Sequence, residues 1–213
     1  RQLDQESDAA AAHLAQAGLT LSPEAPKATL LRRVSLDLTG LPPTPEETDA
    51  YVADARADRY ERLVDMLLTE EPYRTRYAER MSVPWLDIAR YADTSGIHMD
   101  AGRQMWLWRD WVLEAFRENK PYDQMVREVV TADGKSYENG AIGFYIRDYN
   151  MPLDNMAVTT QIFLGTSMVC AQCHNHPFDK WTQMDYYQMA AHTYGMTASN
   201  GLTNPLLAQA IYG

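Results

Sequence analysis

Apolar residues recur at three- and four-residue intervals along most of the chain, the spacing of one face of an α-helix. Alternating apolar and polar positions, which would indicate strands, are nearly absent. The pattern predicts helices over residues 3–17, 60–69, 72–91, 106–119, 122–131 and 182–192. We therefore expect an all-α fold: an irregular multi-helix domain with one long loop and little or no sheet.

Capping residues and prolines predict several helix boundaries. A second helix is expected to open at Ser22 and to end at Gly40, ahead of two prolines that cannot donate a backbone hydrogen bond. Thr44 is followed by proline and, three residues later, by Glu47. A hydroxyl cap, a first-turn proline and a glutamate at the third position predict a helix start there.

The segment 133–155 is punctuated by glycine and asparagine and is expected to be a loop of functional interest. Its only extended piece is expected over 142–146. The apolar pattern resumes afterwards and predicts a helix over 156–170. No repeat or domain boundary is visible, so residues 1–213 are expected to form a single domain.

Composition narrows the range of partners. A share of 46% hydrophobic residues is ordinary for a folded protein. The formal net charge of -10 opposes binding to the phosphate backbone of a nucleic acid. No apolar run approaches the roughly 20 residues that span a bilayer. The chain begins at Arg1 without an apolar leader, so any export signal is expected to have been removed or to lie outside this sequence.

The chemistry of the chain is concentrated in one short motif. The only two cysteines, Cys170 and Cys173, are followed directly by His174 and match C-x-x-C-H, the pattern of covalent c-type haem attachment. Two thiols at this spacing can reach two vinyl groups on one porphyrin edge, and the adjacent imidazole can bind the iron. We expect the multi-helix domain to wrap around one haem c, with 156–196 as the haem-attachment segment.

Two other sites could use the same cysteines. A redox dithiol needs a strand-to-helix context that a helical sequence lacks. A zinc site needs four nitrogen or sulfur ligands, and four donors within seven residues, His176 included, leave little room for tetrahedral closure. Haem attachment is therefore the favoured reading of the motif.

The ligand on the opposite side of the iron strongly affects the reduction potential. Met196 is the first candidate because it follows the helix after the motif, the pair His98 and Met99 comes second, and His192 is third. His176 lies on the same side of the haem as the proximal histidine, so we expect it to hydrogen-bond a haem propionate instead.

Arginines are the other candidate propionate partners, since a guanidinium can donate two hydrogen bonds to one carboxylate. The candidates are Arg103, Arg109 and Arg147. Aromatic residues are dense in the same half of the chain and would suit a haem pocket, because flat rings pack against a porphyrin and exclude water.

Several motifs together resemble a known family. They are DLTGLPPTPE at 37–46, WLDIARYAD at 85–93, WRDWV at 108–112, PYDQ at 121–124 and CAQCHNHPFD at 170–179. This combination resembles the planctomycete cytochrome-c-associated domain, a family of unknown function found in large secreted proteins. The resemblance implies export, and it implies that the chain is one module of a longer polypeptide beside a separate haem domain.

Three functions are consistent with these observations. The first is a mono-haem c-type cytochrome domain, secreted or periplasmic, that transfers electrons or serves as a redox accessory to a partner protein or neighbouring haem domain. The second is a haem enzyme with an open or displaceable sixth iron ligand. The third is a structural haem in an assembly protein. Neither nucleic acid nor a membrane span is expected, and self-association into a homo-oligomer stays open.

Overall fold

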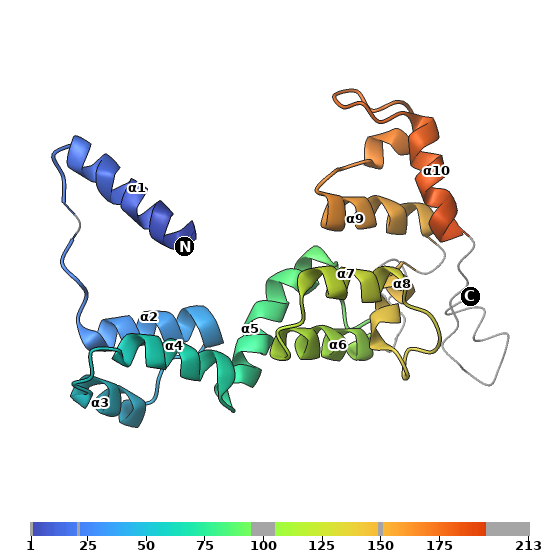
Figure 1. The fold of residues 1–213 in the computed structure, drawn as a ribbon. Helices are drawn as coiled ribbons and strands as arrows, with labels where there is room; N and C mark the ends of the chain where they lie inside the picture. The colour runs from blue at the N-terminus through green and yellow to red at the C-terminus, as the bar shows by residue number, and fades with distance from the viewer. Residues whose placement is uncertain (1, 21, 95–104, 149–150, 195–213) are drawn as a thin grey trace. The chain divides into compact units, whose positions relative to one another are not determined.

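The computed structural model describes residues 2–20, 22–94, 105–148 and 151–194, and these ranges contain helices and no strand (Figure 1). The all-α prediction is therefore confirmed for them. None of their helices has the length and apolar character needed to span a bilayer. In chain order the elements are α1 (Gln2–Gln16), α2 (Lys27–Thr39), α3 (Pro45–Ala53), α4 (Arg59–Thr69), α5 (Tyr73–Ile88), α6 (Trp106–Arg117), α7 (Tyr122–Val130), the 3-10 turn η1 (Gly140–Ile142), α8 (Gly143–Arg147), α9 (Pro152–Leu164), the 3-10 turn η2 (Val169–Gln172) and α10 (Gln183–Tyr194).

The chain packs as two compact units, Arg1–Val64 and Asp65–Gly213. The division falls within α4. The prediction of one domain over 1–213 stays a prediction.

In the first unit, α2 packs against α3. Gly40 ends α2 with φ 71° and donates its N–H to the carbonyl of Leu36, a left-handed cap that glycine adopts without strain. At the start of α3 the Thr44 side chain accepts the N–H of Glu47, and the Glu47 carboxylate accepts the N–H of Thr44. The predicted capping box is therefore confirmed.

The predicted start of the second helix at Ser22 is wrong, because α2 begins at Lys27. Pro26 precedes it with ψ 147°, an extended conformation that stops helix propagation toward the N-terminus. Lys27 also links α2 to the end of α3, because its Nζ donates to the carbonyls of Val52 and Asp54 at 2.9 and 2.7 Å.

The second unit contains a core centred on Trp108 of α6, whose side chain is fully buried. Its ring stacks on that of Trp111 at 5.4 Å and lies 5.6 Å from Trp85 and 6.0 Å from Phe144. Such aromatic contacts add to the free energy gained by burying the rings. α5, α6, η1 and α8 thus share one aromatic core.

The prediction of an extended piece over 142–146 is wrong, since this segment forms the end of η1 and most of α8. Two glycines explain the difference. A Cβ at Gly143 would lie 2.3 Å from Trp108 Cβ, and one at Gly140 would lie 2.5 Å from the Leu107 carbonyl oxygen. Their missing side chains allow the short helical turns to pack directly on α6.

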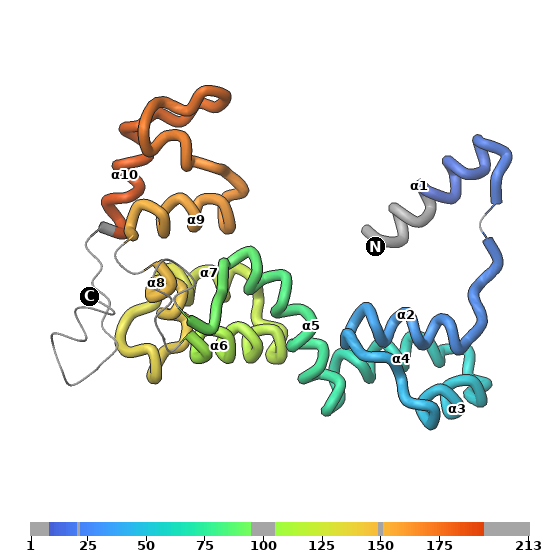
Figure 2. Tube along the Cα trace, turned by 180° about the vertical axis from the view of Figure 1, so that it is seen from behind, coloured from blue at the N-terminus to red at the C-terminus, as the bar shows by residue number. Residues whose placement is uncertain are grey.

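A second core joins α9, η2 and α10, and its buried residues are Met156, Ala157, Met168, Ala171, Tyr186 and Ala190. Figure 1 and Figure 2 both show α9 and α10 side by side. The hydroxyl of Tyr186 donates to the Leu153 carbonyl at 2.9 Å, and that of Thr193 donates to the Pro152 carbonyl at 3.0 Å. Polar links thus join α10 to the start of α9.

The prediction of one helix over 156–170 is wrong in its second half. α9 ends at Leu164, where Gly165 adopts φ 62° and donates its N–H to the Thr160 carbonyl. A left-handed glycine ends a helix at little cost. The motif cysteines therefore lie on η2 and in the loop after it, rather than at the end of a helix.

Candidate functional site

The C-x-x-C-H motif forms a tight turn at the surface of the second unit. Both cysteines carry free thiols and are exposed. The N–H groups of Cys173 and His174 lie 3.3 and 3.4 Å from the Cys170 carbonyl oxygen, and Ala171 between the cysteines is fully buried. Ala171 thus anchors the turn while both thiols remain accessible to a cofactor.

The imidazole of His174 is held in one tautomer by its neighbour. Its Nδ1 lies 2.6 Å from the main-chain carbonyl oxygen of Asn175. A carbonyl oxygen only accepts hydrogen bonds, so Nδ1 carries a proton, and in the neutral ring Nε2 presents its lone pair. This is the arrangement of a histidine that ligates a metal through Nε2.

His176 has the opposite arrangement. The backbone N–H of Phe178 donates to His176 Nδ1 at 3.2 Å, so Nδ1 accepts and the proton of the neutral ring lies on Nε2. The backbone N–H of His176 donates to the Trp181 carbonyl at 2.8 Å and closes the loop at its base. In their neutral rings, Nε2 of His174 therefore presents a lone pair and Nε2 of His176 presents an N–H donor.

Side chains that the sequence did not single out bind this loop to α10. The Oδ1 of Asn175 accepts the N–H of Gln183, the first residue of α10, at 2.9 Å. The Gln172 carbonyl accepts the side-chain N–H of Gln183 and the hydroxyl of Tyr187, both at 3.2 Å. No sequence motif marks Asn175 or Gln183 as a contact residue, so their roles become visible only in the folded loop.

The start of α10 is capped by Thr182 and Asp185. The Thr182 hydroxyl accepts the N–H of Asp185 at 3.1 Å, and the Asp185 carboxylate accepts the Thr182 N–H at 2.9 Å and its hydroxyl at 2.7 Å. The backbone hydrogen bond and then the hydroxyl bond lower the pKa of Asp185 below its ordinary value. A charged carboxylate at this helix end is also favoured by the helix dipole.

Tyr186 is fully buried and belongs to the same core as Ala171 of the motif. Burial is the main cause that raises the pKa of Tyr186 to about 12, and electrostatic interaction with Asp154 adds to it. The phenol therefore stays protonated at physiological pH and keeps its hydrogen bond to the α9 backbone. The core that holds Ala171 therefore contains a tyrosine ring fixed by a hydrogen bond.

The structure describes only some of the other residues that the sequence suggests as iron ligands or propionate partners. His98, Met99, Arg103 and Met196 lie outside the described residues. Arg109 pairs with Asp110 at 2.8 Å, which raises the pKa of its guanidinium.

The two remaining candidates lie on other elements. Arg147 is buried, pairs with Asp148 and donates to the Ala89 carbonyl. His192 is exposed in the last turn of α10.

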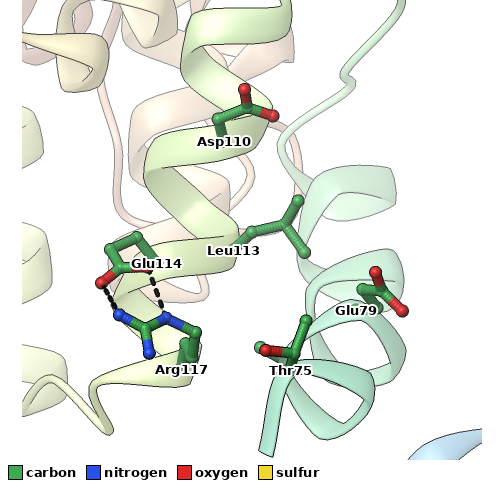
Figure 3. A pocket seen from close by; sticks show the side chains of 7 residues that line it. Thr75, Glu79, Asp110, Leu113, Glu114 and Arg117 are labelled. Carbon is green, nitrogen blue, oxygen red and sulfur yellow. Dashed lines mark hydrogen bonds and ion pairs between the residues drawn. The ribbon is translucent and has the colours of Figure 1, made fainter. Parts of the chain in front are cut away.

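The described residues contain no group of three or more His, Cys, Asp or Glu side chains placed to hold a metal ion. A shallow cavity of about 200 Å³ lies instead between α5 and α6 (Figure 3), lined by Thr75, Ala78, Glu79, Asp110, Leu113, Glu114 and Arg117. Arg117 pairs there with Glu114 at 2.5 Å and with Glu71 at 3.4 Å. This cavity is smaller than typical cofactor sites of about 300–1,000 Å³ and involves none of the motif residues.

Comparison with known proteins identifies the family. No curated protein and no solved structure matches the chain. One family profile, PSCyt2, described as "Protein of unknown function (DUF1549)", matches residues 8–197, which is most of the chain and includes the C-x-x-C-H motif. The expectation of a family of unknown function is thereby confirmed, and the match says nothing about haem. The chain therefore belongs to the PSCyt2 family.

Proposed function

We propose that the chain is a mono-haem c-type cytochrome domain that transfers electrons or serves as a redox accessory module. The observation that carries this proposal is the motif turn. Cys170 and Cys173 are the only cysteines of the chain, both are free and exposed, and His174 directly after them has its Nε2 lone pair available. These are the three groups that haem c attachment requires.

The residues of the turn fit this cofactor chemically. Cys170 and Cys173 would form thioether bonds to the porphyrin, and His174 would bind the iron through Nε2. The Asn175 carbonyl orients the ring and increases the basicity of Nε2 by accepting a hydrogen bond from Nδ1–H. When bound, the haem supplies one-electron oxidation and reduction of its iron.

His176 is the proposed donor to a haem propionate. Its Nε2–H is not the atom that bonds to Phe178, so it can donate to a carboxylate while Nδ1 keeps the loop closed. Arg109 and Arg103 complete the proposed set of propionate partners. For Arg109 this contact competes with the ion pair to Asp110.

The sixth ligand is proposed from Met196 or from His98 and Met99. The geometry of α10 disfavours His192 for this role. His192 lies nine positions after Gln183 and therefore about 13 Å further along the helix axis. The N–H of Gln183 bonds to Asn175, next to His174. At that distance along α10, His192 would not reach a metal that His174 binds.

We further propose that the module functions outside the cytoplasm and exchanges electrons with a partner protein or a neighbouring haem domain. The resemblance to secreted multidomain proteins supports the location. The net charge of -10 favours a partner surface of positive charge, since complementary charges raise the rate of encounter.

The test is expression of the chain in a host that matures c-type cytochromes. We expect a red protein, a pyridine haemochrome typical of two thioether bonds, and an intact mass increased by one haem. The Cys170→Ala/Cys173→Ala variant should be colourless. The His174→Ala variant should keep a covalent haem with an altered iron spectrum, whereas His13→Ala, at an exposed position of α1, should match the unmodified protein.

Colourless protein with two free thiols would contradict the proposal. A covalent haem that is high-spin and binds carbon monoxide would instead favour the haem enzyme with an open sixth position. A low-spin haem unaffected by carbon monoxide or cyanide would support electron transfer.

A further inference from the structure

We propose that the porphyrin lies against an apolar surface beside the motif, formed by Val169, Phe178, Met184 and Tyr187. This motif-side surface belongs to η2, the loop after it and the first turns of α10, and all four side chains are exposed. The inference rests on the proposed haem and names the part of the chain that covers it.

The interior next to the motif is already filled by protein side chains. Met168, Ala171, Tyr186 and Ala190 are each no more than 1% exposed, and Ala171 lies between the two cysteines. Protein interiors pack at crystal-like density, so a porphyrin tethered at Cys170 and Cys173 has no space on that side. It must lie on the outward side of the turn, where both thiols are accessible.

Val169 and Tyr187 flank the attachment points. Val169 directly precedes Cys170, and the Tyr187 hydroxyl donates to the carbonyl of Gln172, between the two cysteines. The Tyr187 ring meets the buried Tyr186 ring at 5.5 Å in an edge-to-face arrangement and remains 43% exposed. Met184 lies one helical turn before Tyr187 and extends the same face of α10.

Phe178 is the most exposed large apolar residue of the described structure, at 95%. Its backbone is nevertheless held in place, because its N–H bonds to His176 and the loop closes through the bond from the His176 N–H to Trp181. A fixed loop that presents a phenylalanine ring to water loses the free energy that burial of the ring would give. A porphyrin attached a few residues away would cover this ring.

Hydroxyl-radical footprinting with mass spectrometry tests this placement. The haem-loaded chain is compared with the haem-free Cys170→Ala/Cys173→Ala variant, after circular dichroism has shown equal helix content. Because a flat porphyrin covers one of two ring faces, we expect oxidation of Phe178 and Tyr187 to fall about twofold or more in the haem-loaded chain. Tyr122 and Tyr137, 56% and 59% exposed and distant from the motif in sequence, serve as controls and should not change.

A second measurement does not require the haem-free variant to fold. In the haem-loaded chain, Phe178→Ser and Tyr187→Ser should each lower the reduction potential, since water reaching the haem stabilises the more highly charged oxidised iron. Tyr122→Ser should leave the potential unchanged.

The outcomes separate the two proposals. Absence of covalent haem would overturn the proposed function and this placement together. Covalent haem with unchanged oxidation at Phe178 and Tyr187, or with unchanged potentials in their serine variants, would overturn the placement alone. Protection that appears only after a second protein is added would assign the motif-side surface to a protein partner and would also overturn the placement.

Discussion

The Nδ1 of His174 lies 2.6 Å from the carbonyl oxygen of Asn175, while the Oδ1 of the same asparagine lies 2.9 Å from the backbone nitrogen of Gln183. One residue thus orients the imidazole and satisfies an N–H at the start of α10 that has no partner within the helix. The position of the proposed iron ligand is therefore linked to the end of a helix.

Replacing Asn175 by alanine should destabilise this connection. The N–H of Gln183 loses its acceptor, and the free energy of unfolding is expected to fall by about 1 kcal/mol, the typical cost of losing a helix-end acceptor. Asn175→Asp keeps an acceptor oxygen at the same position and is the matched control. Urea unfolding followed by circular dichroism measures both, and equal losses in the two variants would exclude the proposed role of Oδ1.

The helices were predictable because their apolar spacing is local and their caps are explicit. Thr44 with Glu47, and Thr182 with Asp185, specify helix starts within four residues of sequence. The errors arose where tertiary contact or backbone conformation overrides the pattern. The pattern over 142–146 predicts an extended segment, but the close packing of Gly143 on Trp108 accompanies a helical turn there. The apolar run over 156–170 predicts one continuous helix, but Gly165 ends α9 in the left-handed region.

The sequence locates the candidate site only through its motif. The motif identifies Cys170, Cys173 and His174 in the printed sequence. The tautomers of His174 and His176 depend on which backbone groups face their Nδ1 atoms, and that follows from the loop conformation. The exposure of Phe178 is likewise a property of the folded loop, since apolar residues are otherwise expected to be buried.

Lowering the pH should weaken the cap of α10. The hydrogen bonds from Thr182 stabilise the charged form of Asp185 and lower its pKa in the folded chain, so folding favours the carboxylate. This stabilisation is fully present above the carboxyl pKa of the unfolded chain, about 3.9. It is lost as the pH falls through the lower folded value.

Comparison of Asp185→Asn with the unmodified chain tests this effect. The melting temperature of the variant should lie below that of the unmodified chain at pH 6, and the difference should shrink as the pH falls below about 4. Amide hydrogen exchange in the first turn of α10 should show the same trend. A difference that is constant across this pH range would contradict a contribution from the charge of Asp185.

Gly143→Ala should be strongly destabilising, because the added Cβ would lie 2.3 Å from Trp108 Cβ and neither atom can rotate away. Overpacking of this kind costs about 1–3 kcal/mol, and we expect the upper end. Gly165→Ala is the comparison: its Cβ meets no atom within 4 Å, but its φ of 62° disfavours alanine by about 1 kcal/mol. Urea unfolding should therefore rank Gly143→Ala as the more damaging, and a reversed order would contradict the close approach of α8 to α6.

Two arginine–aspartate pairs of identical sequence spacing differ in burial and provide a controlled comparison. In the pair Arg147–Asp148 the side chains are 7% and 1% exposed, and in Arg109–Asp110 they are 42% and 48% exposed. Asp148 also accepts a hydrogen bond from Asn155 at 3.1 Å, so it joins α8 to α9. Removing one partner of a buried ion pair typically costs about 3–5 kcal/mol, while an exposed pair contributes about 0–1 kcal/mol.

We therefore expect Asp148→Ala to lower the free energy of unfolding by about 3–5 kcal/mol and Asp110→Ala to change it by less than about 1 kcal/mol. Asp148→Asn keeps one acceptor oxygen and should fall between them. Raising the salt concentration should reduce only the contribution of the exposed pair, because buried charges are screened much less. Guanidinium is itself a salt, so urea unfolding at two sodium chloride concentrations is the suitable measurement. Equal losses at the two aspartates would show that burial of Asp148 does not determine the strength of its ion pair.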